Sequence, residues 1–360
     1  MKIALIARPL AFHGGVERAT AGLVEALVAR GHDVHLLSPG ATIAPAGVTL
    51  HRLRLPRLPA TARVLALAAL AGRAVAAGRW DVVQSHERTL RQHVYRAGEG
   101  CHRAYLASGA SSRPRMIYDR VVQALEARVF AATPRLVAIA RQGQREIERL
   151  FGIGEPRVRV IYNGVDLERF HPDRAAAQRA PARGEAGIDG DEPVLLFAGS
   201  GYERKGLATA IEALPRLDHA RLIVVGRGDE TRYRRLATAL GVSDRVAWLG
   251  LRRDLERWYG AADLLVLPTR YEPFGNVHLE ALASGLAVVT TTAAGGAEVV
   301  EEGKNGAVIA PGDARALANA VSTLLGENRG ALAEAARRAA EPYTHQKQAE
   351  AFERLYREFP

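Results

Sequence analysis

Two glutamates, Glu272 and Glu280, are the side chains whose types and spacing best suit chemistry. They lie in the stretch DLLVLPTRYEPFGNVHLEALASGLAVVTT (263–291), whose apolar pattern predicts a strand, a loop, a helix and a second strand. Glu272 would then follow the carboxyl end of a buried parallel strand, where open α/β sheets bind ligands. Glu280 would lie about one turn into the helix, where its carboxylate could accept two hydrogen bonds from a ribose. A capped helix with one exposed glutamate would show the same spacing.

The segment between the two glutamates has features that suit a phosphate group. Gly275 allows the backbone to approach a ligand closely. The amides of Gly275, Asn276 and Val277 open the predicted helix, and a helix N-terminus attracts anions. We therefore expect this loop to face a phosphorylated ligand.

A second candidate, the loop GSGYERKG (199–206), follows a predicted strand at 194–198. Its glycines, beginning with Gly199, allow close approach of the backbone. Arg204 and Lys205 supply two positive charges, so the loop suits a diphosphate. An ordinary strand-to-helix loop with solvated charges is the alternative.

Metal and thiol chemistry have little support. Asp189-Gly190-Asp191 has the Asp-x-Asp form of a metal motif, but it precedes a predicted strand, so we interpret it as a turn. We see no other cluster of metal ligands and expect no metal and no cofactor. Cys101, the single cysteine, excludes an intramolecular disulfide and is typical of a reducing compartment. The adjacent pair Cys101-His102 lacks an orienting third residue for nucleophilic catalysis.

The elements that would position these residues alternate between strands and helices, which predicts parallel, doubly wound sheets. In the second half, the apolar runs predict strands at 194–198, 221–225, 246–249, 263–267, 288–291 and 307–309. In the first half, they predict strands at 3–7, 34–37, 81–85, 93–97, 136–139 and 158–162. A chain of 360 residues is long enough for two cores.

This pattern divides the chain into four parts. We expect a Rossmann-like domain over 1–165, a hinge or linker over 166–190, a second Rossmann-like domain over 191–340 and a last helix over 341–360. The stretch 171–193 is rich in Ala, Arg, Pro and Gly with little apolar periodicity, which is typical of a linker.

The segment EPFGNVHLEALASGLAVV resembles the acidic signature of the retaining GT-B glycosyltransferases of family 4. The stretch YNGVD (162–166) resembles the interdomain hinge of that family, and the resemblance extends over nearly the whole chain. Within the family, the chain is most similar to the lipopolysaccharide core glucosyltransferase I group. The resemblance implies two domains that face across a cleft and a terminal helix that crosses back to the first domain. The first domain would bind the acceptor and the second the donor.

The resemblance also implies roles for individual residues. Glu272 would meet the donor sugar, Glu280 the nucleotide ribose, and the pair Arg204 and Lys205 the donor diphosphate. His102 would lie against the donor sugar, with His86 as the second choice. Further donor-binding residues implied by the resemblance are Gly14, Gly15, Arg18, Gly199, Arg227, Arg252, Phe274, Gly275, Asn276 and Val277.

The function expected from this resemblance is transfer of a hexose, by default glucose from a UDP-linked donor, to an acceptor hydroxyl. The acceptor would be a lipopolysaccharide core or another envelope glycan or glycolipid. A GT-B sugar-nucleotide epimerase or phosphorylase and a non-catalytic, two-lobed binding protein are the alternatives.

The charge of the chain is uneven. Residues 1–165 contain 24 Lys and Arg against 11 Asp and Glu, or +13, which leaves −3 for residues 166–360 and gives the net +10. This favours an anionic partner such as an acidic membrane surface, near the Arg-rich stretch 51–79, or a phosphorylated acceptor, although a composition bias toward Arg would have the same effect. Aromatic residues make up only 6% of the chain, so we expect no nucleic acid. Without a recognisable signal peptide, we expect a cytoplasmic protein, peripheral at most on the inner membrane face.

Overall fold

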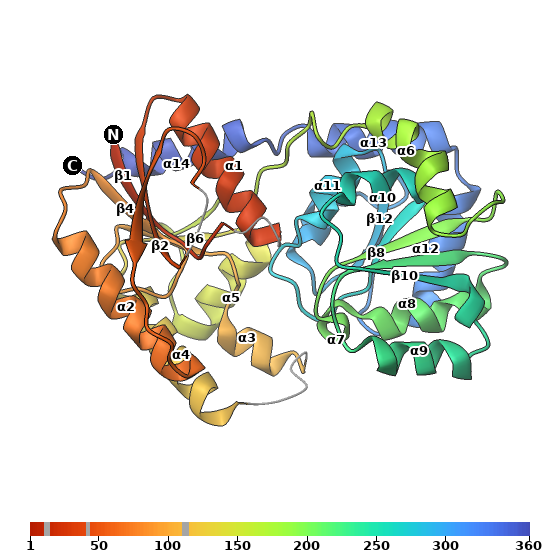
Figure 1. Cartoon of the computed structure of the whole chain (residues 1–360), viewed down its shortest axis with the longest axis horizontal. Coiled ribbons are helices and arrows are strands. Elements are labelled where there is room, and N and C mark those ends of the chain that lie inside the picture. The colour runs from red at the N-terminus through yellow and green to blue at the C-terminus, as the bar shows by residue number, and fades with distance from the viewer. Residues whose placement is uncertain (11–14, 41–43, 110–114) are drawn as a thin grey trace. The chain divides into compact units, whose positions relative to one another are not determined.

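The structure is a computed structural model that describes residues 1–10, 15–40, 44–109 and 115–360. The chain folds into two compact units (Figure 1). Unit 1 comprises Met1–Gly164 and His345–Pro360, and unit 2 comprises Val165–Thr344. No helix in the described ranges is both long and apolar enough to cross a lipid bilayer.

Unit 1 is built on a parallel sheet of seven strands in the order β3-β2-β1-β4-β5-β6-β7. The strands are β1 (Lys2–Ile6), β2 (Asp33–Pro39), β3 (Val48–Leu53), β4 (Val82–Ser85), β5 (Val94–Ala97), β6 (Arg135–Ala138) and β7 (Val158–Val160). The order reverses between β1 and β4, so the loops that follow these two strands diverge at a topological switch point.

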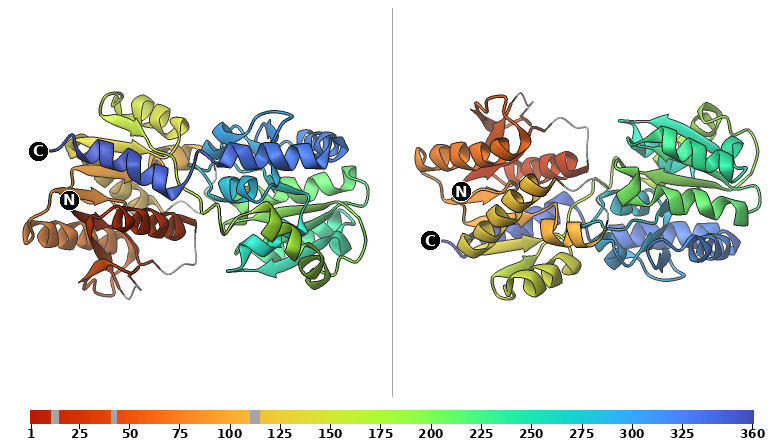
Figure 2. Two further views of the ribbon diagram at one scale, coloured as in Figure 1. Left: turned by 90° about the horizontal axis from the view of Figure 1, so that it is seen from above. Right: turned by 90° about the horizontal axis from the view of Figure 1, so that it is seen from below.

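The helices of unit 1 cover both faces of this sheet (Figure 1). They are α1 (Gly15–Ala29), α2 (Ala60–Ala76), α3 (His102–Ala107), α4 (Met116–Ala132), α5 (Arg141–Phe151) and the C-terminal α14 (His345–Tyr356). Helix α14 packs on α1 (Figure 2). Its Phe352 and Tyr356 are fully buried in the core of unit 1. The Tyr356 hydroxyl donates a hydrogen bond of 2.5 Å to the side-chain oxygen of Gln84. The prediction that the last helix crosses back to the first domain is confirmed.

Unit 2 repeats the design with a parallel sheet of six strands in the order β10-β9-β8-β11-β12-β13. The strands are β8 (Val194–Ala198), β9 (Arg221–Val225), β10 (Val246–Gly250), β11 (Leu264–Leu267), β12 (Ala287–Thr291) and β13 (Gly306–Ile309). Here the order reverses between β8 and β11. The predicted doubly wound architecture is therefore confirmed in both units.

Helices flank the sheet of unit 2 on both faces (Figure 1). They are α6 (Pro172–Glu185), α7 (Tyr202–Lys205), α8 (Leu207–Ala213), α9 (Glu230–Ala239), α10 (Leu255–Ala261), α11 (Val277–Ala283), α12 (Ala314–Gly326) and α13 (Arg329–Ala340). Three 3₁₀ turns complete the unit: η1 (Leu214–Arg216), η2 (Ser243–Arg245) and η3 (Gly295–Val299).

The prediction of a linker over 171–193 is wrong in part, because residues 172–185 form helix α6. The His171 side chain caps the helix by accepting a hydrogen bond from the Asp173 amide. The helix packs closely on α10 at Gly260, where an added Cβ would lie 2.1 Å from the Ala175 carbonyl oxygen. Pro181 inside the helix and the small apolar residues hid its periodicity from sequence analysis.

Strand β3 (Val48–Leu53) was not predicted, because the apolar runs of the first half gave no strand between residues 37 and 81. Its sequence, VTLHRL, is polar at several positions and lies at the edge of the sheet, where most of its side chains are exposed or half-buried. An edge strand of this kind lacks the apolar run that marks the buried strands.

Candidate active site

A cluster of three charged side chains lies at the topological switch point of unit 2. Glu272 follows β11, while Arg204 and Lys205 form the end of α7, directly after β8. Strands β8 and β11 are paired neighbours with parallel register, so their carboxyl ends meet at one edge of the sheet. The topology alone thus brings Glu272 to two adjacent residues that lie 68 and 67 positions before it in the chain.

Two cations converge on one carboxylate oxygen. Arg204 Nη1 donates to Glu272 Oε2 at 2.7 Å, and Lys205 Nζ forms a second ion pair with the same oxygen. Lys205 is 7% exposed and Glu272 is 8% exposed. Burial disfavours the charged carboxylate, but the charges of Lys205 and Arg204 outweigh it and lower the pKa of Glu272 to about 2. Glu272 is therefore an anion at neutral pH.

The backbone around Glu272 is held from both sides. Its amide donates to the Ala293 carbonyl at 3.0 Å, and the Gly295 amide donates to the Glu272 carbonyl at 2.8 Å. On the other side, the Thr269 hydroxyl and the Arg270 amide each donate to the Arg204 carbonyl at 2.8 Å. These bonds lock the loops after β8, β11 and β12 to one another, so the ion pairs have a fixed geometry.

Gly206 marks the closest approach of two of these loops. Its φ is +78°, and an added Cβ would lie 1.8 Å from the Pro268 carbonyl oxygen. Gly199 serves a similar purpose, because an added Cβ there would lie 3.0 Å from Lys205 Cε. Glycine at these positions lets the cations reach Glu272.

Glu280 lies on α11 and is 4% exposed. The Tyr259 hydroxyl, from α10, donates to Glu280 Oε2 at 2.9 Å. This bond orients the carboxylate, and a carboxylate has several further lone pairs that can accept hydroxyl hydrogens. The predicted helix is present, but it spans only seven residues, so its dipole contributes less to anion binding than expected.

His278 is a buried residue of this site that sequence analysis did not single out. Its Nδ1 donates to the Gly275 carbonyl at 2.7 Å, and its Nε2 lies 2.8 Å from the Thr290 hydroxyl. Burial lowers the pKa of His278 to about 4, so the imidazole is neutral at physiological pH. Gly275 and Gly296 both lie against the ring, since an added Cβ would be 2.8 and 2.5 Å from Nδ1. His278 thereby shapes the loop that carries the Glu272 signature.

The remaining predicted residues of unit 2 have different surroundings. Phe274 is fully buried beside this loop, and Asn276 and Val277 begin α11. The Arg227 amide donates to the Ser200 hydroxyl at 3.1 Å, so Arg227 borders the loop after β8 while its side chain is exposed. Arg252 instead pairs with Asp254 at 3.0 Å and Glu185 at 2.9 Å, contacts that tie it to α6 and α10 rather than to Glu272.

The predicted residues of unit 1 form a separate group. His102 Nε2 lies 3.0 Å from Asp119 Oδ1, and the His102 amide donates to the buried Glu126 carboxylate. His86 is enclosed between Thr20 and Gln84, and burial lowers its pKa well below the ordinary value.

Three further residues of unit 1 were expected to bind the donor. Gly15 begins α1, Arg18 is half-buried on the same helix, and Gly14 lies outside the described residues. The part of these residues and of His102 in donor binding stays a prediction.

The described ranges contain no group of three or more His, Cys, Asp or Glu side chains that could hold a metal ion. The cations of the site are instead the side chains of Arg204 and Lys205 themselves.

Two known families match the chain in succession. The family described as Glycosyltransferase Family 4 matches residues 13–169, and the one described as Glycosyl transferases group 1 matches residues 192–327. The chain belongs to the family 4 glycosyltransferases.

Individual proteins agree with this assignment. An uncharacterized glycosyltransferase of Methanocaldococcus jannaschii is 28% identical over 350 residues, which cover 91% of this chain and 90% of the relative. Among solved structures, WaaG, a glycosyltransferase involved in lipopolysaccharide biosynthesis, is 24% identical with a TM-score of 0.84, over 98% of this chain and 99% of WaaG. HepE of Anabaena, solved in complex with UDP-glucose, is 20% identical with a TM-score of 0.79 over the full length of both chains. These two likenesses establish the GT-B fold of this glycosyltransferase.

Proposed function

We propose that this glycosyltransferase moves a hexose from a UDP-linked donor to an acceptor hydroxyl with retention of the anomeric configuration. The observation that carries the proposal is the convergence of Arg204 and Lys205 on Glu272 at the switch point of unit 2. This arrangement supplies, in one place, the charges that a departing diphosphate needs and a carboxylate for the sugar.

Departure of the diphosphate is the step that most needs help, because negative charge grows on the leaving oxygen. A diphosphate at this site would compete with Glu272 for Arg204 and Lys205, and each cation would stabilise the growing charge. Two fixed cations could take the place of a divalent metal, so we propose a metal-independent reaction.

The carboxylates would orient the donor. Once its cations turn to the diphosphate, Glu272 can accept hydrogen bonds from the sugar hydroxyls. Glu280, oriented by Tyr259, would accept both hydroxyls of the ribose. Fixing both ends of the donor positions the anomeric carbon for reaction.

The identity of the substrates has indirect support. HepE binds UDP-glucose, and WaaG is involved in lipopolysaccharide biosynthesis, so we propose UDP-glucose as donor and an envelope glycan or glycolipid as acceptor. The excess of positive charge in residues 1–165 suits an anionic acceptor or contact with an anionic membrane surface. Contact of that kind would place the protein on the inner, cytoplasmic face of the membrane.

A thermal-unfolding panel of UDP, GDP, ADP and their sugars, with and without EDTA, tests the donor. A nucleotide at about 100 times its Kd adds about 2.7 kcal/mol of stability. We expect UDP compounds alone to stabilise the wild type, independently of EDTA, and to do so less in Glu280→Ala. Glu327→Gln, an exposed carboxylate of the same unit, is the matched control and should respond like the wild type. The donor assignment fails if no nucleotide raises the unfolding temperature.

A further inference from the structure

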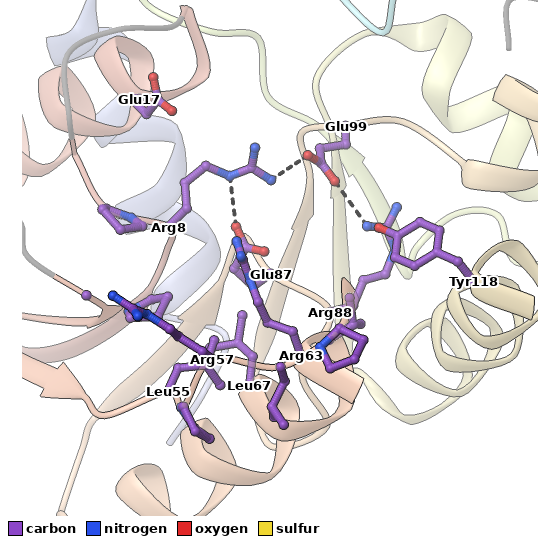
Figure 3. Close-up of a pocket in the computed structure, with 17 residues that line it drawn as sticks. Arg8, Glu17, Leu55, Arg57, Arg63, Leu67, Glu87, Arg88, Glu99 and Tyr118 are labelled. Carbon is purple, nitrogen blue, oxygen red and sulfur yellow. Dashed lines mark hydrogen bonds and ion pairs between the residues drawn. The ribbon is translucent and has the colours of Figure 1, made fainter. Parts of the chain in front are cut away.

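Unit 1 contains a pocket of about 1020 Å³ that the chemistry above does not use (Figure 3). Its lining comes from the segments that follow the carboxyl ends of β1 through β5, together with α1, α2 and α4. The pocket therefore occupies the same edge of its sheet, at the switch point between β1 and β4, as the Glu272 cluster does in unit 2. Ligands of open α/β sheets bind at this place.

One wall of the pocket is a chain of alternating charges. Arg8 bridges two carboxylates, with Nε 3.1 Å from Glu87 and a second bond to Glu99. Arg88 continues the chain, donating to Glu99 at 3.0 Å and to the buried Glu126 at 3.1 Å. Three carboxylates share two guanidiniums, so carboxylate lone pairs remain for other hydrogen-bond donors.

Glu17 adds an acceptor at the same pocket. Its Oε2 is buried and, within the described ranges, has no hydrogen-bond partner. A buried carboxylate oxygen without a donor is costly, and a ligand hydroxyl would satisfy it. Burial raises the pKa of Glu87 even though the charge of Arg8 opposes this, so Glu87 itself lies in a desolvated part of the pocket wall.

The side of the pocket formed by residues 55–67 is different in character (Figure 3). Leu55, Leu58, Val64 and Leu67 present apolar groups, of the kind that pack on the C–H faces of a sugar ring. Tyr118, from α4, adds an aromatic ring with a polar tip.

Two guanidiniums on this side have no hydrogen-bond or ion-pair partner among the described residues. They belong to Arg57 and Arg63, which line the pocket and are exposed. Arginine binds phosphate in a forked geometry with two parallel hydrogen bonds. The pocket therefore combines hydroxyl acceptors, an apolar surface and two guanidiniums that no described side chain pairs.

We infer that this pocket binds the acceptor, and that the acceptor is a saccharide that carries a phosphate group close to free hydroxyls. The hydroxyls face Glu87, Glu99 and Glu17, the ring packs on the leucines, and the phosphate binds Arg57 and Arg63. A neutral sugar would leave both guanidiniums without a function. The role as acceptor rests on the proposed transferase function, whereas the chemistry of the ligand follows from the pocket itself.

The test is a calorimetric titration of the full-length protein with the 6-phosphates of glucose, mannose and galactose, the parent hexoses, and inorganic phosphate. We expect at least one sugar phosphate to bind about tenfold or more tightly than both its parent hexose and phosphate alone. The double variant Arg57→Ala/Arg63→Ala should lose this preference, whereas Arg128→Ala, an exposed arginine on α4 outside the pocket, should keep it. Vesicles of phosphatidylcholine with and without phosphatidylinositol show whether the same arginines also take a lipid-linked polyol phosphate.

Three results would overturn the inference: no sugar phosphate binds, the preference survives the double variant, or UDP displaces the sugar phosphate from the pocket. The proposed donor site is measured separately by UDP binding. We expect Arg204→Ala to weaken UDP binding and leave sugar-phosphate binding unchanged, and the pocket variants to do the reverse. Loss of the acceptor inference alone and loss of the proposed function are thereby distinguished.

Discussion

The two units use the same topology to build sites of opposite character. In unit 2, Arg204 and Lys205 meet on one buried carboxylate, and hydrogen bonds fix the surrounding loops. In unit 1, the equivalent edge opens into a pocket whose Arg8 and Glu99 side chains are 38% and 40% exposed. Both clusters lie at a switch point, so topology decides where they form, while loop packing decides how exposed their side chains are.

This difference fits the two substrates of a transferase. A nucleotide diphosphate always presents the same groups, which a rigid cluster can match in advance. An open pocket that is lined by long side chains from loops is easier to alter by substitution. Four variant pairs, ordered by expected effect, test this contrast.

The largest effect is expected at the rigid site. Glu272→Gln removes the charge that organises Arg204 and Lys205 and should reduce the transfer rate by about 10²–10³-fold. Glu99→Gln in the open pocket should reduce it by less than about tenfold, because Arg8 and Arg88 each keep a second carboxylate. Steady-state rates of sugar transfer check both variants, and equal losses would refute the contrast.

Packing of the rigid site can be measured through its glycines. Gly206→Ala places a Cβ against the Pro268 carbonyl and should reduce the free energy of unfolding by about 3 kcal/mol or more. Gly201 has the same φ of +78° but open space around it, so Gly201→Ala should cost only about 1 kcal/mol. Denaturant unfolding measures the free energy of unfolding of both variants. Because the two glycines share the same φ, the difference between the variants gives the cost of the close contact at Gly206 without the cost of backbone strain.

Each unit also contains a buried neutral histidine, His278 in unit 2 and His86 in unit 1. Burial lowers the pKa of both histidines. Between pH 6.5 and about 4, His278 is therefore protonated in the unfolded chain but neutral in the folded protein. Stability is therefore lost as pH falls through this range, by about 2 kcal/mol between pH 7 and pH 5 for His278. Denaturant unfolding at the two pH values should show a smaller difference in His278→Gln and in His86→Gln. An unchanged difference in either variant would show that its histidine is not responsible.

The smallest effect concerns only unit 1. Hydrogen bonds from Arg30 and His32 outweigh the effect of burial and lower the pKa of Glu353 to about 2. The same bonds tie α14 to the end of α1 and the turn that follows it. Since the folded pKa is depressed, this contribution is present above the ordinary pKa near 4.5 and is lost as pH falls toward 2. Glu353→Gln should cost about 1 kcal/mol at neutral pH. Glu350 contacts the same Arg30 from a more exposed position. Glu350→Gln should therefore reduce the free energy of unfolding by less, and thermal unfolding of both variants checks this.

Much of the rigid site was predictable, because its residues follow regular apolar strands. The run before Glu272 and the run before Arg204 both mark buried parallel strands, and parallel strands of one sheet end at one edge. Their direct ion pairs were not predictable, since sequence separates them by 67 to 68 positions and strand order is unknown before folding. His278 was missed although it lies inside the signature, because a histidine on a predicted helix gives no sign of the loop it will contact.

The open pocket was much harder to foresee. Its residues come from five loops with no shared motif, and one of its walls follows β3, an edge strand whose polar sequence hid it. Sequence analysis registered Arg57 and Arg63 only as part of a basic stretch. Helix α6 was missed for a related reason, since its contacts involve backbone and small residues rather than an apolar stripe.

The return of α14 to unit 1 has a consequence for synthesis of the chain. Unit 2 is one continuous segment, Val165–Thr344, and all of it has been made before the last helix appears. Unit 1 still lacks Phe352 and Tyr356 of its core at that moment, so its apolar surface under α14 is uncovered. Because domains fold as units, unit 2 can form its core from one continuous segment, whereas unit 1 needs two segments that are far apart in the chain. The core of unit 1 is therefore complete only once residues 345–360 have packed on it.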